Sequence, residues 1–228
     1  ITMITIENLS KSYGDKSVLE NITLNLKKGK VYGIVGENGA GKTTLFNCIS
    51  GLEKHSGTIS CEYGNPKISL GYLQTEPYYF SKITGMEYLS LLCNARNIQP
   101  INSVEKNIFD LPLNEYANNY STGMKKKLAI TALLLQENKF FILDEPFNGV
   151  DIHSNMIITE IIQQLKRLEK TILISSHIFS TLNETCDEIF LLKNKTINMR
   201  VKKDEFGILE NELKEFSIGN RISKLNLK

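Results

Sequence analysis

Hydrophobic and polar positions follow different periods along this chain, and the changes of period outline its elements. Residues 3–9 and 18–26 alternate apolar and polar side chains, which predicts half-buried strands. Apolar runs at residues 31–35, 140–143 and 171–175 instead predict strands covered on both faces, as in a parallel sheet. Shorter strands are predicted at residues 56–60, 68–73 and 188–192, with a last one after residue 196.

Helices are predicted between and after these strands, at residues 45–49, 121–136, 154–168, 179–185 and 203–216. Residues 84–119 lack strand-forming runs, and Thr84 with Glu87 forms a capping box at the start of a helix. Pro100 and Pro112 separate further short helices. Because this stretch is too short to bury a core of its own, we expect a helical insertion rather than an independent domain.

A glycine-rich stretch lies between the apolar run at residues 31–35 and the first helix. It fits the P-loop pattern G-x-x-x-x-G-K-[ST] and reads Gly36-Glu37-Asn38-Gly39-Ala40-Gly41-Lys42-Thr43-Thr44. Glycines let successive N–H groups point into one concavity, and the following helix turns its positive end toward the same space. Lys42 adds a mobile charge for the outer phosphates of a nucleotide, and Thr43 supplies a hydroxyl for Mg²⁺. A plain glycine turn is the alternative, but the strand–loop–helix setting favours the P-loop.

Two acidic residues follow the apolar run at residues 140–143. Asp144 would stand at the carboxyl edge of the sheet, beside the P-loop, where it can hold Mg²⁺ directly or through water. Glu145 comes next along the chain. The alternative is a strand that simply ends in an exposed aspartate, which the P-loop upstream makes the poorer explanation.

These features predict an α/β fold: a P-loop NTPase core of mainly parallel sheet with helices on both faces. We also expect an N-terminal antiparallel β part and a small helical subdomain. One domain would span residues 1–228, with the core and β part at residues 1–74 and 137–228 and the helical subdomain at residues 75–136.

Composition and charge narrow the class of protein. The 228 residues are 41% hydrophobic and 23% charged, as in an ordinary soluble globular protein, and the net charge of +2 gives no sign of nucleic-acid binding. No apolar run approaches the roughly 18 residues of a membrane span, so a membrane role would belong to a partner. The cysteines lack C-x-x-C spacing, which argues against a zinc site or disulfide framework and suits a reducing compartment; they are Cys48, Cys61, Cys93 and Cys186.

The order of motifs resembles the ATP-binding cassette (ABC) ATPases, the motor subunits of ABC transporters, over essentially the whole chain. Asp144-Glu145-Pro146 is similar to the Walker B motif with its catalytic glutamate, and Tyr13 resembles the aromatic residue that stacks on adenine, with a buried core ring as the alternative. Other stretches resemble the signature motif, the D-loop and the switch histidine: Ser121-Thr122-Gly123-Met124-Lys125, Asn148-Gly149-Val150-Asp151 and Ser175-Ser176-His177.

The resemblance implies a role for each of these residues. Glu145 would act as general base or orient the attacking water, and His177 would contact the γ-phosphate. Ser121 and Gly123 would serve the ATP of an opposite subunit, and Asp151 would contribute to nucleotide binding, although an ordinary helix cap is the common task of such a serine. The implied partners are a second ABC ATPase subunit, in a homodimer or heterodimer, and an integral-membrane permease. ATP and Mg²⁺ are the implied cofactors, and the chain would sit in the cytoplasm on the inner face of the membrane.

Departures from the family pattern leave two points open. Met124-Lys125 in the signature resembles the branch that exports antibiotics and drugs through separately encoded permeases. The stretch Gly71-Tyr72-Leu73-Gln74-Thr75-Glu76-Pro77 resembles the Q-loop without its usual proline, so either Gln74 contacts metal and water, or Thr75 or Glu76 takes its place. We favour Gln74.

Other functions fit the chain less well. Residues 125–127 are all lysine, which we interpret as a solvated helix face rather than a nucleic-acid contact, because no aromatic residue interleaves with them. A soluble ABC ATPase of DNA repair or of the ribosome is the main alternative, but such proteins generally carry paired cassettes or long coiled-coil insertions. A small GTPase needs Asn-Lys-x-Asp, and Asn194-Lys195-Thr196-Ile197 lacks the aspartate.

Overall fold

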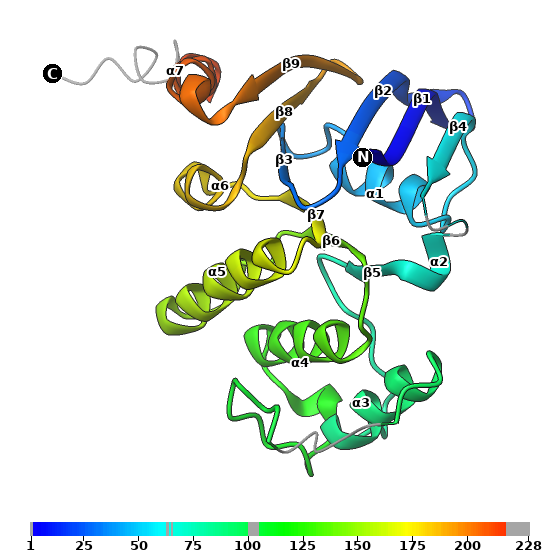
Figure 1. The fold of residues 1–228 in the computed structure, drawn as a ribbon, viewed down its shortest axis with the longest axis vertical. Helices are drawn as coiled ribbons and strands as arrows, with labels where there is room; N and C mark the ends of the chain where they lie inside the picture. Colours follow the sequence, from blue (N-terminus) through cyan, green and yellow to red (C-terminus); the bar gives the residue numbers. More distant parts are fainter. Residues whose placement is uncertain (1, 63, 65, 100–104, 218–228) are drawn as a thin grey trace, which may run out of the picture.

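Two sheets form the frame of the molecule in the computed structural model, which describes residues 2–62, 64, 66–99 and 105–217 (Figure 1). The core sheet has six strands in the order β5-β6-β7-β3-β8-β9, parallel from β5 to β8 and closed at one edge by the antiparallel β9. Its strands are β3 (Val31–Val35), β5 (Leu70–Leu73), β6 (Phe140–Asp144), β7 (Thr171–Ser175), β8 (Glu188–Lys193) and β9 (Thr196–Lys202).

The second sheet is antiparallel, in the order β2-β1-β4. Its strands are β1 (Thr2–Tyr13), β2 (Lys16–Lys27) and β4 (Ser56–Cys61). The first two strands run further than their alternation predicts, because Tyr13 pairs with Lys16 and leaves only two residues for the turn. Gly14, at φ 57°, supplies the left-handed conformation that such a tight turn requires.

Helices cover the core sheet on both faces, and with the two sheets they confirm the predicted fold class. In β3, Val31 and Val35 pack toward helices α3–α7, whereas Tyr32 and Ile34 pack toward α1 and the antiparallel sheet. Both faces of this strand are therefore buried, which explains its continuous apolar run. The helices are α1 (Lys42–Ile49), α2 (Pro66–Ser69), α3 (Gly85–Asn94), α4 (Thr122–Leu135), α5 (Ile152–Arg167), α6 (Phe179–Thr185) and α7 (Phe206–Ser217), with 3₁₀ turns at Ala117–Asn119 and Lys203–Glu205.

The stretch between β5 and α4 departs most from the expectation. Thr84 caps α3 as predicted, and its capping box with Glu87 is formed on both sides. After α3 the described residues are largely irregular up to the 3₁₀ turn Ala117–Asn119, so the prediction of further short helices around Pro112 is wrong. Pro100 lies outside the described residues. Residues 68–69, predicted as strand, belong to the turn α2 instead.

Helices α3 and α4 pack together at the end of the molecule away from the antiparallel sheet (Figure 1). No helix in the described part of the chain is both long and apolar enough to cross a membrane.

Candidate active site

The carboxyl ends of four neighbouring parallel strands meet at one edge of the core sheet and carry most of the predicted site. β3 leads into the P-loop at residues 36–44, β5 into Gln74 and Thr75, β6 ends at Asp144, and β7 is followed by His177. This edge is where open α/β sheets bind ligands. A cavity of about 380 Å³ lies there, lined by Val18, Asn38, Gly39, Gly41, Lys42, Thr43, Thr44, Thr75, Asp144, Glu145 and His177.

The P-loop has the backbone shape that a phosphate cradle needs. Gly41 caps α1 at φ 107° and Gly39 lies at φ 82°, both in the region that favours glycine. Gly36 is required for a different reason, since a Cβ there would lie 2.4 Å from the carbonyl oxygen of Leu192. The loop can therefore pass close under β8 and present its N–H groups at the start of α1.

Lys42 lies folded along the inside of this loop. Its Nζ donates to the carbonyl oxygens of Gly36, at 2.8 Å, and Glu37, at 3.2 Å. Burial lowers the pKa of Lys42, while the nearby carboxylates of Glu145 and Asp144 act in the opposite direction. The ammonium group thus sits between the loop and the two carboxylates, where the outer phosphates of a nucleotide would add further negative charge.

Asp144 is the most heavily bonded group in the site. It pairs in register with Ser175 across β6 and β7, and Ser175 Oγ donates to Asp144 Oδ1 at 2.6 Å. Thr43 and Thr75 each donate their hydroxyl to Asp144 Oδ2 at 2.7 Å. The carboxylate is 1% exposed, so these bonds offset its burial and fix its direction toward the P-loop.

Glu145 and His177 lie beside Asp144 and contact each other. His177 Nε2 is 3.0 Å from Glu145 Oε1, and the His177 backbone N–H donates to Glu145 Oε2 at 3.2 Å. Glu145 itself adopts the left-handed conformation at φ 52°, which is uncommon for a residue with a side chain. Its backbone N–H is held by Ser175 Oγ at 3.0 Å, so one serine positions both acidic residues.

Lys126 contradicts the interpretation of residues 125–127 as a solvated helix face. Its side chain is 1% exposed, and its Nζ donates to the backbone carbonyl oxygen of Glu145 at 2.6 Å. Burial lowers the pKa of Lys126, with the carboxylates of Glu145, Asp144 and Glu76 acting in the opposite direction. The middle lysine of the run therefore faces the site from α4.

The structure favours Thr75 over Gln74 at the position next to the aspartate. Thr75 is half-buried and bonded to Asp144, whereas Gln74 is exposed and does not line the cavity. The path of the loop after β5 turns the second residue, rather than the first, toward the P-loop. The metal contact of Gln74, which the sequence favoured, stays a prediction.

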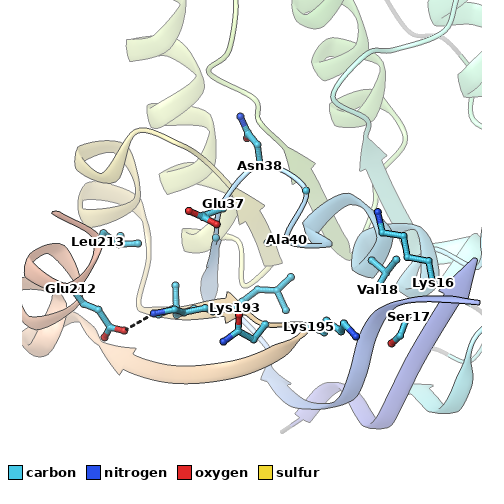
Figure 2. Close-up of a pocket in the computed structure, with 15 residues that line it drawn as sticks. Lys16, Ser17, Val18, Glu37, Asn38, Ala40, Lys193, Lys195, Glu212 and Leu213 are labelled. Atoms are coloured by element: carbon cyan, nitrogen blue, oxygen red, sulfur yellow. Dashed lines mark ion pairs between the residues drawn. The ribbon is translucent and has the colours of Figure 1, made fainter. Parts of the chain in front are cut away.

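A second cavity of about 330 Å³ adjoins the first, and Val18, Asn38 and Gly39 line both. Figure 2 shows it between the P-loop, the turn from β8 to β9 with Lys193 and Lys195, and the start of β2 with Lys16. Helix α7 closes it on another side through Glu212 and Leu213.

Tyr13 lies near these cavities in the chain but lines neither of them. It is 46% exposed, so it is not the core ring that was the alternative, and Lys11 Nζ lies 4.5 Å from the centre of its ring. The open face of the aromatic ring leaves room for a flat ligand.

The signature residues lie apart from the chain's own P-loop and line neither cavity. Ser121 is the N-cap of α4 and its Oγ accepts from the Met124 backbone N–H at 3.2 Å. Gly123 packs against the D-loop so closely that a Cβ would lie 2.6 Å from the carbonyl oxygen of Gly149. Asp151 caps α5 through Ser154, and these bonds hold the pKa of its carboxyl well below its usual range.

The sequence missed the contributions of Val18, Lys126 and Ser175. Ser175 could have been found, since the last residues of two adjacent apolar strands are expected to lie side by side. Lys126 carried no such signal, because its partner is a backbone carbonyl oxygen 19 residues further along the chain.

The groups at this edge fit a magnesium–nucleotide complex. Thr43 and Thr75 offer two hydroxyls, each 2.7 Å from the same carboxylate oxygen of Asp144, an all-oxygen set of the kind that Mg²⁺ prefers. The glycine cradle at residues 36–41 and the ammonium of Lys42 suit phosphate oxygens.

Known proteins resemble this chain in sequence. A family model described as ABC transporter matches residues 19–148. The lantibiotic transport ATP-binding protein SrtF of Streptococcus pyogenes is 34% identical over 208 residues, which cover 86% of this chain and 89% of that protein. The bacitracin transport ATP-binding protein BcrA of Enterococcus faecalis is 32% identical over 234 residues, which cover 96% of this chain and 75% of that protein.

Solved structures have the same fold. An ATP-binding subunit of an ABC transporter superposes with a TM-score of 0.82 at 26% identity and covers 94% of this chain and 99% of its own. An ATP-binding cassette solved as a dimer after hydrolysis, with ADP and phosphate bound, has a TM-score of 0.80 at 20% identity. The match covers 88% of this chain and 99% of that one.

Proposed function

This chain belongs to the ABC transporter family, and from that premise we propose that it is the ATP-hydrolysing motor of an exporter for an antibiotic or a similar compound. The observation that carries the proposal is one cavity at the carboxyl edge of the core sheet. The P-loop lysine Lys42, the buried Asp144 and the contacting pair of Glu145 and His177 all line this cavity. Two relatives named for lantibiotic and bacitracin transport support the export of such compounds.

ATP hydrolysis at this site rests on positioning and on charge. Lys42 would leave the carbonyl oxygens of its own loop and bind the outer phosphates, while the N–H groups at the start of α1 stabilise the same oxygens. Glu145 would take a proton from the attacking water, and His177, which touches its carboxylate, would hold that water against the γ-phosphate. Mg²⁺, held by Thr43, Asp144 and Thr75, would neutralise charge on the phosphate oxygens when bound.

The base and sugar of the nucleotide would lie toward the second cavity. Val18, Asn38 and Gly39 line both cavities, so a ligand with its phosphates in the first can continue into the second (Figure 2). Tyr13 lies at the end of β1, three residues before Lys16, and its exposed ring would stack on adenine after a small movement of that turn.

A second subunit would complete the site. Ser121 and Gly123 stand at the N-terminus of α4, which suits an anion, yet they lie outside the cavity of their own P-loop. Ser121 is exposed, and so is the side chain of Asp151 beside it in the fold. Two chains placed head to tail would bring these residues onto each other's nucleotide.

The membrane partner would dock close to Thr75. Tyr78 and Phe80 are 72% and 56% exposed, and their rings contact edge to face at 5.5 Å. A pair of exposed aromatic side chains on a loop is typical of a protein–protein contact surface. Because this loop follows Thr75 directly, a permease bound there could sense the occupancy of the site.

The test of the proposal is recovery of a permease from the source organism. Tagged chain added to detergent-solubilised membranes should retain an integral-membrane protein, and the double variant Tyr78→Ser/Phe80→Ser should lose it because the aromatic contact surface is gone. ATP hydrolysis by the isolated double variant should stay at the wild-type level. Recovery of ribosomes or DNA-repair proteins in place of a membrane protein would favour the soluble alternative instead.

The position of Thr75 gives a prediction that separates it from Gln74. Thr75→Val removes the hydroxyl bonded to Asp144 with little change of shape, and we expect ATP–Mg²⁺ affinity to fall about five- to tenfold, the equivalent of about 1 kcal/mol. Gln74→Ala, the matched control on the exposed neighbour, should change affinity far less. Titration calorimetry with ATP and Mg²⁺ measures both, and the reverse order would return the role to Gln74.

A further inference from the structure

The backbone of Glu145 is clamped from two sides. Ser175 Oγ accepts from its N–H at 3.0 Å, and Lys126 Nζ donates to its carbonyl oxygen at 2.6 Å. Between these two bonds, the residue holds φ at 52°, a left-handed conformation that costs a side-chain-bearing residue free energy. The direction of the Glu145 carboxylate therefore depends on both clamps.

The two clamps come from different parts of the fold. Ser175 ends β7 in the core sheet, next to Asp144. Lys126 belongs to α4, the helix that begins with the signature residue Ser121, and it is 1% exposed. A fully buried ammonium group is costly unless it has a partner, so the bond to the Glu145 carbonyl is a specific and strongly held contact.

The neighbouring residues of α4 contact the segment that follows Glu145. Lys127 Nζ lies 3.2 Å from Ser154 Oγ and 3.4 Å from Asp151 Oδ2, and Gly123 packs on Gly149. The first two turns of α4 thus hold the whole stretch from Glu145 to Asp151. Any shift of α4 moves the carbonyl group of Glu145 with it.

We propose that Lys126 is a positioning residue for hydrolysis, which holds Glu145 in its left-handed conformation and links the signature helix α4 to the catalytic carboxylate. This inference rests on the role proposed above for Glu145. Movement of α4 when its N-terminus meets the nucleotide of a second subunit would pass through Lys126 to the carboxylate that activates water. Hydrolysis would thereby respond to the presence of the opposite subunit.

The decisive variant is Lys126→Met, which keeps the length of the side chain and removes its donor. We expect kcat for ATP to fall about 10- to 100-fold, because a small displacement of a catalytic group has effects of that size. KM should stay within about twofold, since Lys42 and the P-loop are unchanged. Lys126→Arg, which restores a charged donor, should recover most of kcat.

Two readouts and one control variant separate positioning from a merely structural role. Slow hydrolysis should lengthen the lifetime of the ATP-bound dimer of Lys126→Met. Light scattering measures this lifetime independently of the turnover rate. In the Glu145→Gln background, Lys126→Met should cause little further loss of single-turnover rate, because both changes act on one group. Lys166→Met, which removes the 2.8 Å ion pair between Lys166 on α5 and Asp187 just before β8, is the control for loss of a partly buried lysine and should leave kcat unchanged.

Different results would overturn the positioning role of Lys126 and the catalytic role of Glu145 on which it rests. A lower melting temperature of Lys126→Met with unchanged kcat would overturn the inference, as would an equal loss of rate in both backgrounds. If Glu145→Gln hydrolyses ATP at the wild-type rate, the proposed role of Glu145 fails first, whatever Lys126 does.

Discussion

Replacement of Glu145 by glutamine should nearly abolish ATP hydrolysis and leave an ATP-bound dimer that persists while ATP is present. Glutamine keeps the shape of the side chain but cannot accept a proton from water, and loss of a general base costs about 10²- to 10⁴-fold in rate. Binding should survive, because Lys42, Thr43 and Asp144 remain in place. Phosphate release measures the first effect, and light scattering with and without ATP measures the second.

Glu137→Gln is the matched control for this experiment. Glu137 has nearly the same backbone conformation as Glu145, at φ 54°, but it is exposed and lies outside the cavity. The control should hydrolyse ATP normally and form only a transient dimer. If neither the control nor Glu145→Gln responds to ATP in light scattering, the proposed dimeric mechanism is contradicted.

The parallel core was predictable because its strands are buried on both faces. A strand of this kind has no polar face, so β3 and β7 stand out as apolar runs, and their predicted bounds are those of the structure. The extension of β1 as far as Tyr13 and of β2 back to Lys16, and the helix turn at residues 66–69, were missed for a shared reason. Both depend on the backbone conformation of only a few residues, and the pattern of hydrophobic and polar positions carries no information about that conformation.

The candidate site divides in the same way between local and distant causes. The P-loop and Asp144 were expected to meet because both stand at the carboxyl ends of strands, whereas Glu145 and His177 were assigned to the site by the resemblance to the ABC family; all of them line one cavity. Lys126 and Thr75 act through partners that lie far away in the chain, at separations of 19 and 69 residues. For Lys126 the local pattern was misleading, because a run of lysines indicated a solvated helix face; for Thr75 no local signal outweighed that of the neighbouring Gln74, whose metal contact stays a prediction.

Replacement of Lys42 by alanine should abolish nucleotide binding. The ammonium group would donate charge-assisted hydrogen bonds to the outer phosphates, and two such bonds at about 1.5–3 kcal/mol each amount to a loss of affinity on the order of 100-fold or more. The melting temperature should change little by comparison. In the protein without nucleotide, Lys42→Ala removes only the two hydrogen bonds from Lys42 Nζ to the loop carbonyl oxygens of Gly36 and Glu37, at the edge of the cavity.

Lys30→Ala is the control for this change, since Lys30 is a half-exposed lysine that pairs with Asp187 at 3.5 Å, away from the cavity. Calorimetric titration with ATP should show wild-type affinity for Lys30→Ala and no measurable heat of binding for Lys42→Ala. The Glu145→Gln dimer gives a second readout, because adding Lys42→Ala to it should prevent the ATP-induced rise in light scattering. A double variant that still dimerises with ATP would contradict the proposed role of Lys42 in binding the outer phosphates of the nucleotide.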